Sequence, residues 1–327
     1  MATKFTSNGV ATLLSFPDSS TRTTIQHARY RNKAIFGYGI GASGVAISMT
    51  NLLNNIGLLD NDVSGVGTAR YYLGAAGYGG DKAIFGYGFS PSPNTWQSMT
   101  NLVSNLGVVS TDVIGVGSVR WKVAASGYGD DKAIFGFGSS AVTGGPFYSL
   151  TNLVSNVGTV ATDTAGVGTI REGPAAAGYG GDKAIFGYGS NPNTSNWYSI
   201  TNLVSNVGVV ATDTTGVGTT RELLSAAGYG GDKAIFGFGV KLGTSYSITN
   251  LVSNVGVVAT DTTNSTGVRY AGGAAGYGGD KAAFAFGYGP STYNSLLNLV
   301  SNVGVLSTST FGVGTARQSV AAAGFGS

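Results

Sequence analysis

Hydrophobic residues are grouped along this chain in short runs separated by glycine, asparagine, aspartate and serine, and the same runs return many times. Each copy has four of them: a small apolar run such as 175–180 or 225–230, then Lys-Ala-Ile-Phe-Gly-Tyr, then Tyr-Ser-Ile-Thr-Asn-Leu-Val, then Val-Gly-Val-Val-Ala-Thr-Asp. Short runs rich in Val, Ile, Thr, Tyr and Phe and bounded by turn residues predict β-strands. Helical periodicity is absent from them, so the pattern predicts an all-β protein.

The runs form a repeat, and the arginine that ends each copy marks its register. A fixed period of this kind is the signature of a repeat architecture, in which each copy is one structural unit. The arginines are 48 to 51 residues apart, at Arg22, Arg70, Arg120, Arg171, Arg221, Arg269 and Arg317. The repeats therefore extend over residues 22–69, 70–119, 120–170, 171–220, 221–268 and 269–316.

The chain begins and ends inside a repeat. Residues 1–21 match a second half, and residues 317–327 match the opening segment of another copy. A closed ring explains this division, because pairing the two end segments in one unit closes the circle. Four short strands per repeat, arranged in a ring, describe the blade of a β-propeller. We predict one domain over residues 1–327: a seven-bladed β-propeller of four-stranded blades, closed by pairing N- and C-terminal strands in one blade (1–21 plus 317–327).

The unit resembles a kelch repeat over nearly the whole chain. Arg221 begins the unit, residues 225–230 stand where the kelch inner strand lies, and residues 234–239 stand where an apolar strand ends in Gly-Gly. Two departures are clear: the glycine doublet is Gly-aromatic-Gly, and the tryptophan of the fourth strand is replaced by Val or Ala. The resemblance implies a kelch-like propeller. The signatures of the chromosome-condensation-regulator repeat are missing, so that type fits less well.

Composition limits the class of protein. The 327 residues include 55 glycines, 42% apolar residues and only 10% charged residues, a balance opposite to that of disordered chains. No apolar run approaches the length of a membrane-spanning helix, and the N-terminus lacks the long apolar core of a secretion signal. Without cysteine there is no disulfide and no thiolate metal site.

Most charges belong to the repeat, and the net charge is only +3. Because acids and bases alternate within it, we expect ion pairs, including one between each loop aspartate and the arginine eight residues later, and no nucleic-acid surface. The repeat-borne aspartates are Asp81, Asp131, Asp182, Asp232 and Asp280 before the lysines, and Asp62, Asp112, Asp163, Asp213 and Asp261 before the arginines.

Catalytic or metal chemistry is not expected. His27 is the only histidine, and no candidate nucleophile accompanies it. The Gly-Tyr-Gly-Gly-Asp-Lys segment lacks the context of a phosphate-binding loop, and one aspartate per Thr-Asp-Thr-Thr-Gly loop is too few for calcium. We therefore predict no enzyme activity, no metal and no cofactor.

The loop between the second and third runs is the variable part of the repeat, and it carries aromatic residues. These side chains either pad the blade edges or form a recognition surface, where Trp and Tyr are favoured contact residues. The candidate binding residues are the loop aromatics Trp96, Tyr148, Trp197, Tyr198, Tyr246 and Tyr293, together with the repeat arginines Arg70, Arg120, Arg171, Arg221, Arg269 and Arg317.

Two functions of different classes follow. The first is a non-enzymatic structural or attachment protein that docks on a protein assembly or a cell-surface glycan and can form homo-oligomers. Its composition is similar in style to accessory virion proteins of tailed bacteriophages, which implies a place in a virion. The alternative locations are the cytoplasm or release by lysis. The second function is a lectin-like propeller with equivalent sugar sites between blades, strengthened by multivalency.

Overall fold

The computed structural model describes residues 32–142 and 144–326, and the prediction of an all-β protein is confirmed for them. The only helical element among these residues is the 3-10 turn η1 (Pro192–Thr194). Within the described part of the chain, no helix has the length and apolar character that a membrane crossing would need.

The first three runs of each repeat form a small antiparallel sheet in which the Lys-Ala-Ile-Phe run is the middle strand. The inner strands are β3 (Gly74–Tyr78), β8 (Ala124–Tyr128), β11 (Ala175–Tyr179), β14 (Ser225–Tyr229), β20 (Gly273–Tyr277) and β25 (Ala321–Phe325). The middle strands are β1 (Lys33–Gly41), β4 (Lys82–Gly86), β9 (Lys132–Gly136), β12 (Lys183–Asn191), β15 (Lys233–Gly237) and β21 (Lys281–Gly289). The third strands are β2 (Ala46–Leu53), β7 (Thr100–Val103), β10 (Thr151–Val154), β13 (Asn196–Val204), β18 (Ile248–Val252) and β22 (Thr292–Val300).

Short strands extend some of these sheets. β5 (Phe89–Ser90) pairs with β6 (Thr95–Trp96), and β16 (Val240–Lys241) pairs with β17 (Thr244–Ser245), each in a hairpin between the middle and third strands. β24 (Arg317–Gln318) pairs with the end of β1.

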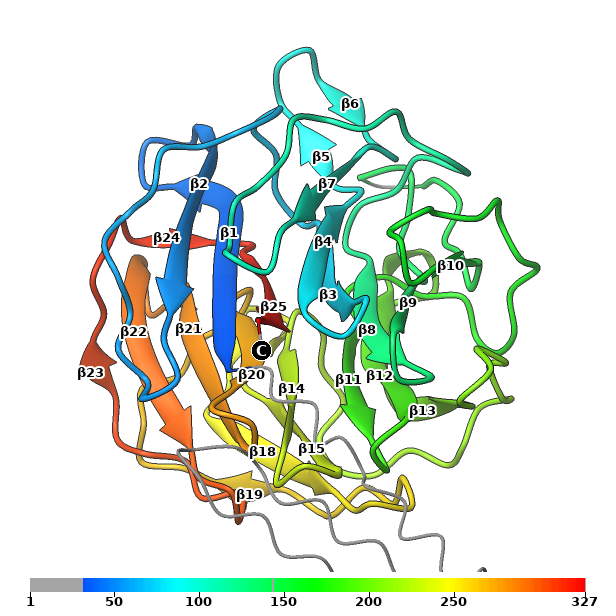
Figure 1. The fold of residues 1–327 in the computed structure, drawn as a ribbon. Helices are drawn as coiled ribbons and strands as arrows, with labels where there is room; N and C mark the ends of the chain where they lie inside the picture. The colour runs from blue at the N-terminus through cyan, green and yellow to red at the C-terminus, as the bar shows by residue number, and fades with distance from the viewer. Residues whose placement is uncertain (1–31, 143, 327) are drawn as a thin grey trace, which may run out of the picture.

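The inner strands lie next to one another in the order β25, β3, β8, β11, β14 and β20, and β20 is again next to β25 (Figure 1). Two sets of backbone hydrogen bonds follow the same circular order. In one set, one residue of each repeat donates its backbone N–H to the carbonyl of the equivalent residue in the preceding repeat, at 2.5 to 3.4 Å. These residues are Tyr72, Lys122, Gly173, Leu223, Ala271 and Ser319, and Tyr72 donates to Ser319. In the other set a glycine N–H donates to a carbonyl of the following repeat, from Gly79, Gly129, Gly180, Gly230, Gly278 and Gly326.

The C-terminal strand takes a different partner from the one predicted. β25 pairs with β1, from Lys33↔Phe325 to Gly37↔Ala321, and so supplies the inner strand for the first Lys-Ala-Ile-Phe run. The other half of the predicted closing blade, residues 1–21, lies outside the described residues, as does His27. Among the described residues there are six sheets of this repeat rather than seven, since residues 317–326 complete an existing sheet instead of starting a new one.

The predicted fourth strand is mostly irregular. Among the described residues, only the short strands β19 (Thr262–Thr263) and β23 (Thr310–Phe311) lie there, and elsewhere the segment is held by isolated bridges such as Thr100↔Val113 and Val103↔Val109. Between these two bridges the Asn101 side chain donates to the carbonyl of Ser110 at 3.0 Å. A side chain thus replaces the missing ladder bond, and the sheet edge stays short and uneven, which protects it from pairing with other chains.

The core lies between neighbouring sheets. The phenylalanine of each Lys-Ala-Ile-Phe run is almost completely buried, and its ring packs against the glycine that ends the same run in the preceding sheet. At Gly187, for example, an added Cβ would lie 2.7 Å from Cζ of Phe236. The ring of the next sheet therefore leaves room for only a very small residue at this position, which is glycine in all but one of the described middle strands.

Candidate functional site

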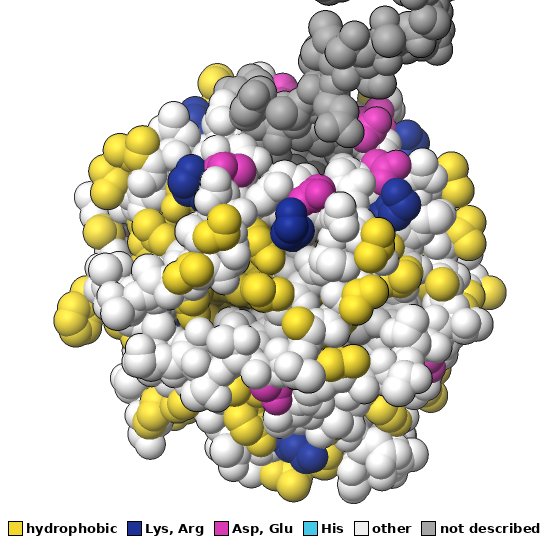
Figure 2. All heavy atoms as spheres, turned by 90° about the horizontal axis from the view of Figure 1, so that it is seen from below, with side chains coloured by type: hydrophobic (Ala, Val, Ile, Leu, Met, Phe, Trp, Pro, Cys, Tyr) yellow, Lys and Arg dark blue, Asp and Glu magenta, His cyan; other side chains and the backbone are white. Residues whose placement is uncertain are grey.

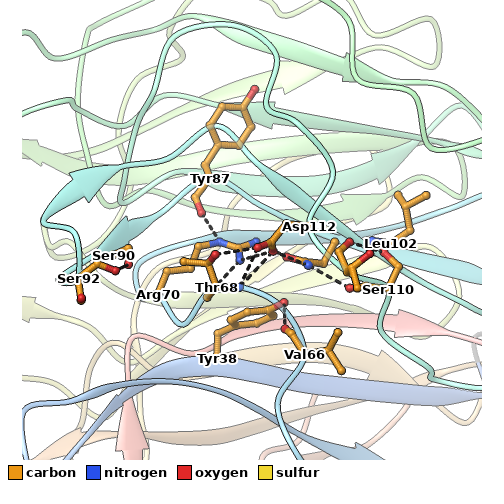
Figure 3. Close-up of polar contacts among 12 residues, drawn as sticks. Tyr38, Val66, Thr68, Arg70, Tyr87, Ser90, Ser92, Leu102, Ser110 and Asp112 are labelled. Atoms are coloured by element: carbon orange, nitrogen blue, oxygen red, sulfur yellow. Dashed lines mark hydrogen bonds and ion pairs between the residues drawn. The ribbon is translucent and has the colours of Figure 1, made fainter.

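Each repeat arginine is enclosed by residues of its own repeat and by an aromatic side chain of the repeat before it. Arg70 is 0% exposed, its Nε donates to the carbonyl of Tyr87 at 2.8 Å, and its Nη2 donates to Oδ1 of Asn101 at 2.6 Å (Figure 3). Its guanidinium carbon also lies 4.6 Å from the ring centroid of Tyr38. The arginine thus links three segments and two neighbouring sheets.

The aromatic residue beneath each arginine has a strained backbone that explains the Gly-aromatic-Gly departure from the kelch pattern. Tyr38 has φ 62° and lies in a β-bulge between Gly37 and Gly39. A bulge with a positive φ turns the side chain out of the usual alternation. The same conformation recurs at Tyr87, Phe137, Tyr188, Phe238 and Phe286, each under the arginine of the next repeat.

The ion pair of the loop aspartate differs from the predicted one. Asp112 lies 3.8 Å from Arg70, which opens the same repeat, and the pair with the arginine eight residues later is not formed. Likewise Asp62 pairs with Arg317 at 3.6 Å. The aspartate is turned away from the following arginine because it also accepts hydrogen bonds from Asn101 and Thr68 (Figure 3).

One repeat lacks this acid. Ser309 stands where the other repeats have aspartate, and Nη1 of the buried Arg269 has no hydrogen-bond partner. Burial lowers the pKa of Arg269 to about 9, with no carboxylate to oppose it, whereas burial opposed by Asp213 lowers the pKa of Arg171 to about 10.

The six repeat arginines that were predicted to bind a ligand are 0–1% exposed and turned into the fold. They are therefore unsuited to contact a ligand from solvent.

The predicted loop aromatics are half-buried and lie on the edge of the sheets. Trp96 packs on Phe89 with centroids 5.4 Å apart, Tyr293 packs on Tyr288 at 5.2 Å, and the Tyr148 hydroxyl lies 3.0 Å from that of Ser140. Tyr198 and Tyr246 each accept the N–H of the next arginine on their carbonyl. Each of these rings covers a sheet edge and leaves part of its surface accessible, so they pad the edges and still offer contact area.

The described structure also has a charged cluster that the sequence reasoning missed, at the end of the ring where the loops lie. Lys122 Nζ is 2.5 Å from Oε1 of Glu172 and 3.9 Å from Oε2 of Glu222. The second oxygen of Glu172 accepts from the Ser139 hydroxyl at 2.6 Å, and Glu222 accepts from Ser190 at 2.8 Å. We call Tyr72, Lys122, Glu172 and Glu222 the axial cluster.

The axial cluster carries a fixed charge pattern. Burial acts to lower the pKa of Lys122, but the two carboxylates outweigh it and raise the pKa above its ordinary value, so the amine is protonated. A signal for this cluster was present in the sequence: the chain has only two glutamates, and both directly follow a repeat arginine in neighbouring repeats. Because both oxygens of Glu172 are hydrogen-bonded, the arrangement suits recognition better than proton transfer.

The opposite end of the ring carries the turns that are nearly the same in every repeat, together with the Lys–Asp pairs. Lys183 lies 2.6 Å from Asp182, and the equivalent pairs at Lys82, Lys132, Lys233 and Lys281 are 2.7 to 2.9 Å apart. Figure 2 shows hydrophobic side chains spread over this side of the molecule between cations and acids that lie side by side. We call it the turn face, and the other end the loop face.

The aliphatic side chains of the turn face stand on rigid turns. For example, Ser205 Oγ accepts the N–H groups of Val207 and Val209. These two valines are 70% and 64% exposed. The aliphatic ring, as we name this set, comprises Ile56, Leu58, Leu106, Val108, Val157, Val207, Val209, Val255, Val257, Val303 and Val305.

No protein-family model matches the chain, and no curated protein is significantly similar to it. Within the described residues, no group of three or more His, Asp or Glu side chains is placed to hold a metal ion. Function must therefore be argued from the geometry alone.

Proposed function

We propose that the chain is a six-bladed, kelch-like β-propeller that acts as a non-enzymatic attachment protein. The circular order of the inner strands and the two circular sets of backbone hydrogen bonds support the six-bladed ring. In this proposal the turn face docks on a larger protein assembly, and the loop face meets the surface to be recognised.

The observation that carries the proposal is the aliphatic ring. Single exposed aliphatic residues are ordinary on protein surfaces, but these share one face and one turn position. Val, Leu or Ile side chains 59–72% exposed recur there in successive repeats, and serine hydroxyls hold the turns rigid. Such a surface suits a partner protein because its desolvation stabilises the complex at little cost in conformational entropy.

The loop face suits recognition for the opposite reason. Its loops differ between repeats and present half-buried Trp and Tyr side chains on a rigid framework. Binding residues are commonly found on such loops. The likeness in composition to accessory virion proteins names the first assembly to test.

The test compares incorporation into an assembled particle purified from the source. The triple variant Val207→Asp/Val255→Asp/Val303→Asp places charges on the aliphatic ring, and Leu242→Asp is the matched control, since Leu242 is 75% exposed on a loop of the other face. We expect the triple variant to keep its melting temperature and to fall at least tenfold in particle content, as measured by quantitative mass spectrometry. The control should match the wild type.

Equal incorporation of both variants would refute docking through the turn face. Sedimentation of the purified chain separates another occupant: a concentration-dependent dimer that the triple variant abolishes would mean that the aliphatic ring binds a second copy instead.

A further inference from the structure

The mouth of the ring on the loop face is where the repeats differ most in chemistry. The six residues whose backbones form the first circular set of hydrogen bonds carry unlike side chains, from Gly173 and Ala271 to Tyr72 and Lys122. They surround a hollow of about 80 Å³. Beneath them the next residue of each repeat is small or apolar, as with Leu73, and these residues close the floor.

The polar groups at this mouth can both donate and accept. Lys122 supplies a cation, and Glu222 supplies a carboxylate that is 15% exposed, accepts from the Ser190 hydroxyl and lies 3.9 Å from Lys122 Nζ. Ser319 lines the hollow, but its hydroxyl faces the Tyr72 side chain and is closed to solvent. The accessible polar groups of the mouth are therefore those of Lys122 and Glu222.

An aromatic wall leads from the mouth onto the variable loop 89–98. Tyr72 packs edge-on against Trp121 with centroids 5.3 Å apart, and Lys122 Nζ lies 5.1 Å from the Trp121 ring. Tyr71, Phe89 and Trp96 continue the same cluster outward. Trp121 and Phe89 are only 7% exposed, so the accessible apolar surface beside the polar groups is that of the half-buried Tyr71, Tyr72 and Trp96.

These features select the class of ligand. An anion would meet two carboxylates, and a second cation would compete with the ammonium group of Lys122 that already lies beside both. A neutral group with several hydroxyls can accept from the Lys122 ammonium group and donate to the Glu222 carboxylate together, because each hydroxyl can donate and accept. An apolar C–H face would suit the aromatic wall and the floor.

We propose that the mouth of the ring binds the terminal residue of a neutral glycan, with Lys122 and Glu222 hydrogen-bonding its hydroxyls and Trp121 beside it. The hollow admits the edge of one sugar ring, and the following residues of the glycan lie along the aromatic wall. This inference rests on the proposed recognition role of the loop face. It predicts one site per chain, in contrast to equivalent sites between blades.

The test uses the purified full chain and an array of neutral oligosaccharides, followed by calorimetric titration of the strongest binder. We expect a stoichiometry of one, and a loss of affinity of about tenfold or more in Lys122→Met and in Glu222→Gln, as expected for hydrogen bonds to charged groups. Lys241→Met is the matched control, because Lys241 donates to the Thr220 hydroxyl and belongs neither to the axial cluster nor to the lining of the hollow.

Trp121 supplies a second readout that does not depend on the charge variants folding. The sugar should change the tryptophan fluorescence of the wild type, and a monosaccharide that fills only the hollow should lose this change in Trp121→Phe, in which Trp96 and Trp197 remain. The proposal is overturned if no neutral glycan binds, if only amines or amino acids bind, or if several equivalent sites titrate. Loss of particle incorporation in the aliphatic-ring variant is a separate result, so failure of docking and failure of sugar binding can be told apart.

Discussion

The repeat arginine carries a charge that suggests a surface residue, but in the fold it is buried and holds neighbouring segments together. Its charge is surrounded by the carbonyl of an aromatic residue, an asparagine amide oxygen, an aspartate and an aromatic ring of the preceding sheet, as at Arg171. A buried charge of this kind stabilises only while its partners are present, because its desolvation must be offset. The residues around it are therefore coupled.

The coupling predicts different costs at two equivalent arginines. Arg171→Met should lower the free energy of unfolding by about 3 kcal/mol, because it leaves Asn202 and Asp213 without their partner. Arg269→Met should cost clearly less, because this arginine lacks a carboxylate and one of its nitrogens is unpaired. Urea unfolding of both variants checks the order, and an equal or reversed order would contradict it.

Restoring the missing acid should have the opposite effect. Ser309→Asp places a carboxylate where Asn298 already donates a hydrogen bond to the serine, in the repeat of the unpaired Arg269. We expect stabilisation of about 1 kcal/mol, in line with a hydrogen-bonded ion pair at a partly exposed site. Ser309→Asn, which adds the same shape without the charge, is the control. A melting temperature no higher than that of the control would refute the prediction.

At the scale of single elements, the middle strand of each sheet determines how neighbouring sheets approach. Its glycine receives the phenylalanine ring of the following sheet, and the bulge after it turns an aromatic side chain under the next arginine. One middle strand has alanine in place of the glycine, at Ala285. A small side chain is thus compatible with the position, and a branched one is not.

Gly187→Val should therefore be strongly destabilising. Its Cβ would lie 2.7 Å from Phe236 and 3.1 Å from Thr201, closer than ordinary contacts, and overpacking of a core typically costs about 1–3 kcal/mol. Gly41→Val is the matched control, because nothing lies within 4 Å of a Cβ added there. Thermal unfolding followed by circular dichroism distinguishes the two variants. Equal melting temperatures would mean that the neighbouring sheets can move apart at Gly187 without loss of stability, which would contradict the prediction.

At the scale of the whole molecule, β25 joins the two ends of the described chain. Its pairing with β1 buries Phe325 completely and adds Ala321 and Ala323 to the apolar cluster shared with the β3–β4 sheet. Contacts of such large sequence separation form late and cost loop-closure entropy. Stability should thus depend on this short strand more than its length suggests.

Removal of residues 321–327 should abolish cooperative unfolding, because it exposes the edge of β1 and opens the apolar cluster. Phe325→Ala should be intermediate and lower the free energy of unfolding by about 3–5 kcal/mol, the usual cost of a large core truncation. Differential scanning calorimetry checks the series. A truncated chain that melts like the wild type would mean that β25 is not needed to hold the ring together.

Acid should weaken the whole ring at once. Partial burial acts to raise the pKa of Asp213, but hydrogen bonds from Thr169 and Asn202 and the charge of Arg171 outweigh it, so its pKa lies below the ordinary 3.8. The same holds for Asp62, Asp112, Asp163 and Asp261. A carboxylate whose pKa is lower in the folded chain stabilises the fold above its unfolded pKa, and this stabilisation is lost as pH falls through the folded value.

We therefore expect a free energy of unfolding that is nearly constant between about pH 5 and 7 and decreases below about pH 4. Urea unfolding across this range measures it, and Asp213→Asn should reduce the slope in acid. Stability that rises below pH 4 would contradict the assigned direction of these pKa shifts.

Much of the fold could be predicted from the sequence because it is written in local patterns. The small apolar run, the Lys-Ala-Ile-Phe-Gly-Tyr run and the Tyr-Ser-Ile-Thr-Asn-Leu-Val run all contain strands, with ends that differ from the expected bounds by up to about three residues, since alternation and turn residues act over a few positions. The prediction of a regular fourth strand was mostly wrong, because a local pattern does not show that the Asn101 side chain replaces a ladder bond.

The candidate site was less predictable because it depends on contacts between distant segments. Sequence reasoning chose the arginines, which are buried, and passed over Glu172 and Glu222, although their shared position after an arginine was visible. The loop aromatics lie at accessible sheet edges, so their part in recognition stays a prediction.

The sequence by itself therefore determined the repeat, its strands and its uneven surface, because these follow from short-range chemistry repeated along the chain. Only the tertiary structure decided which segments meet: Asp112 with Arg70 rather than Arg120, β25 with β1, and Lys122 with two glutamates at the mouth of the ring. These contacts join residues that are about 40 to nearly 300 positions apart, and no local pattern encodes such distances, since they are set by how the sheets pack around one centre.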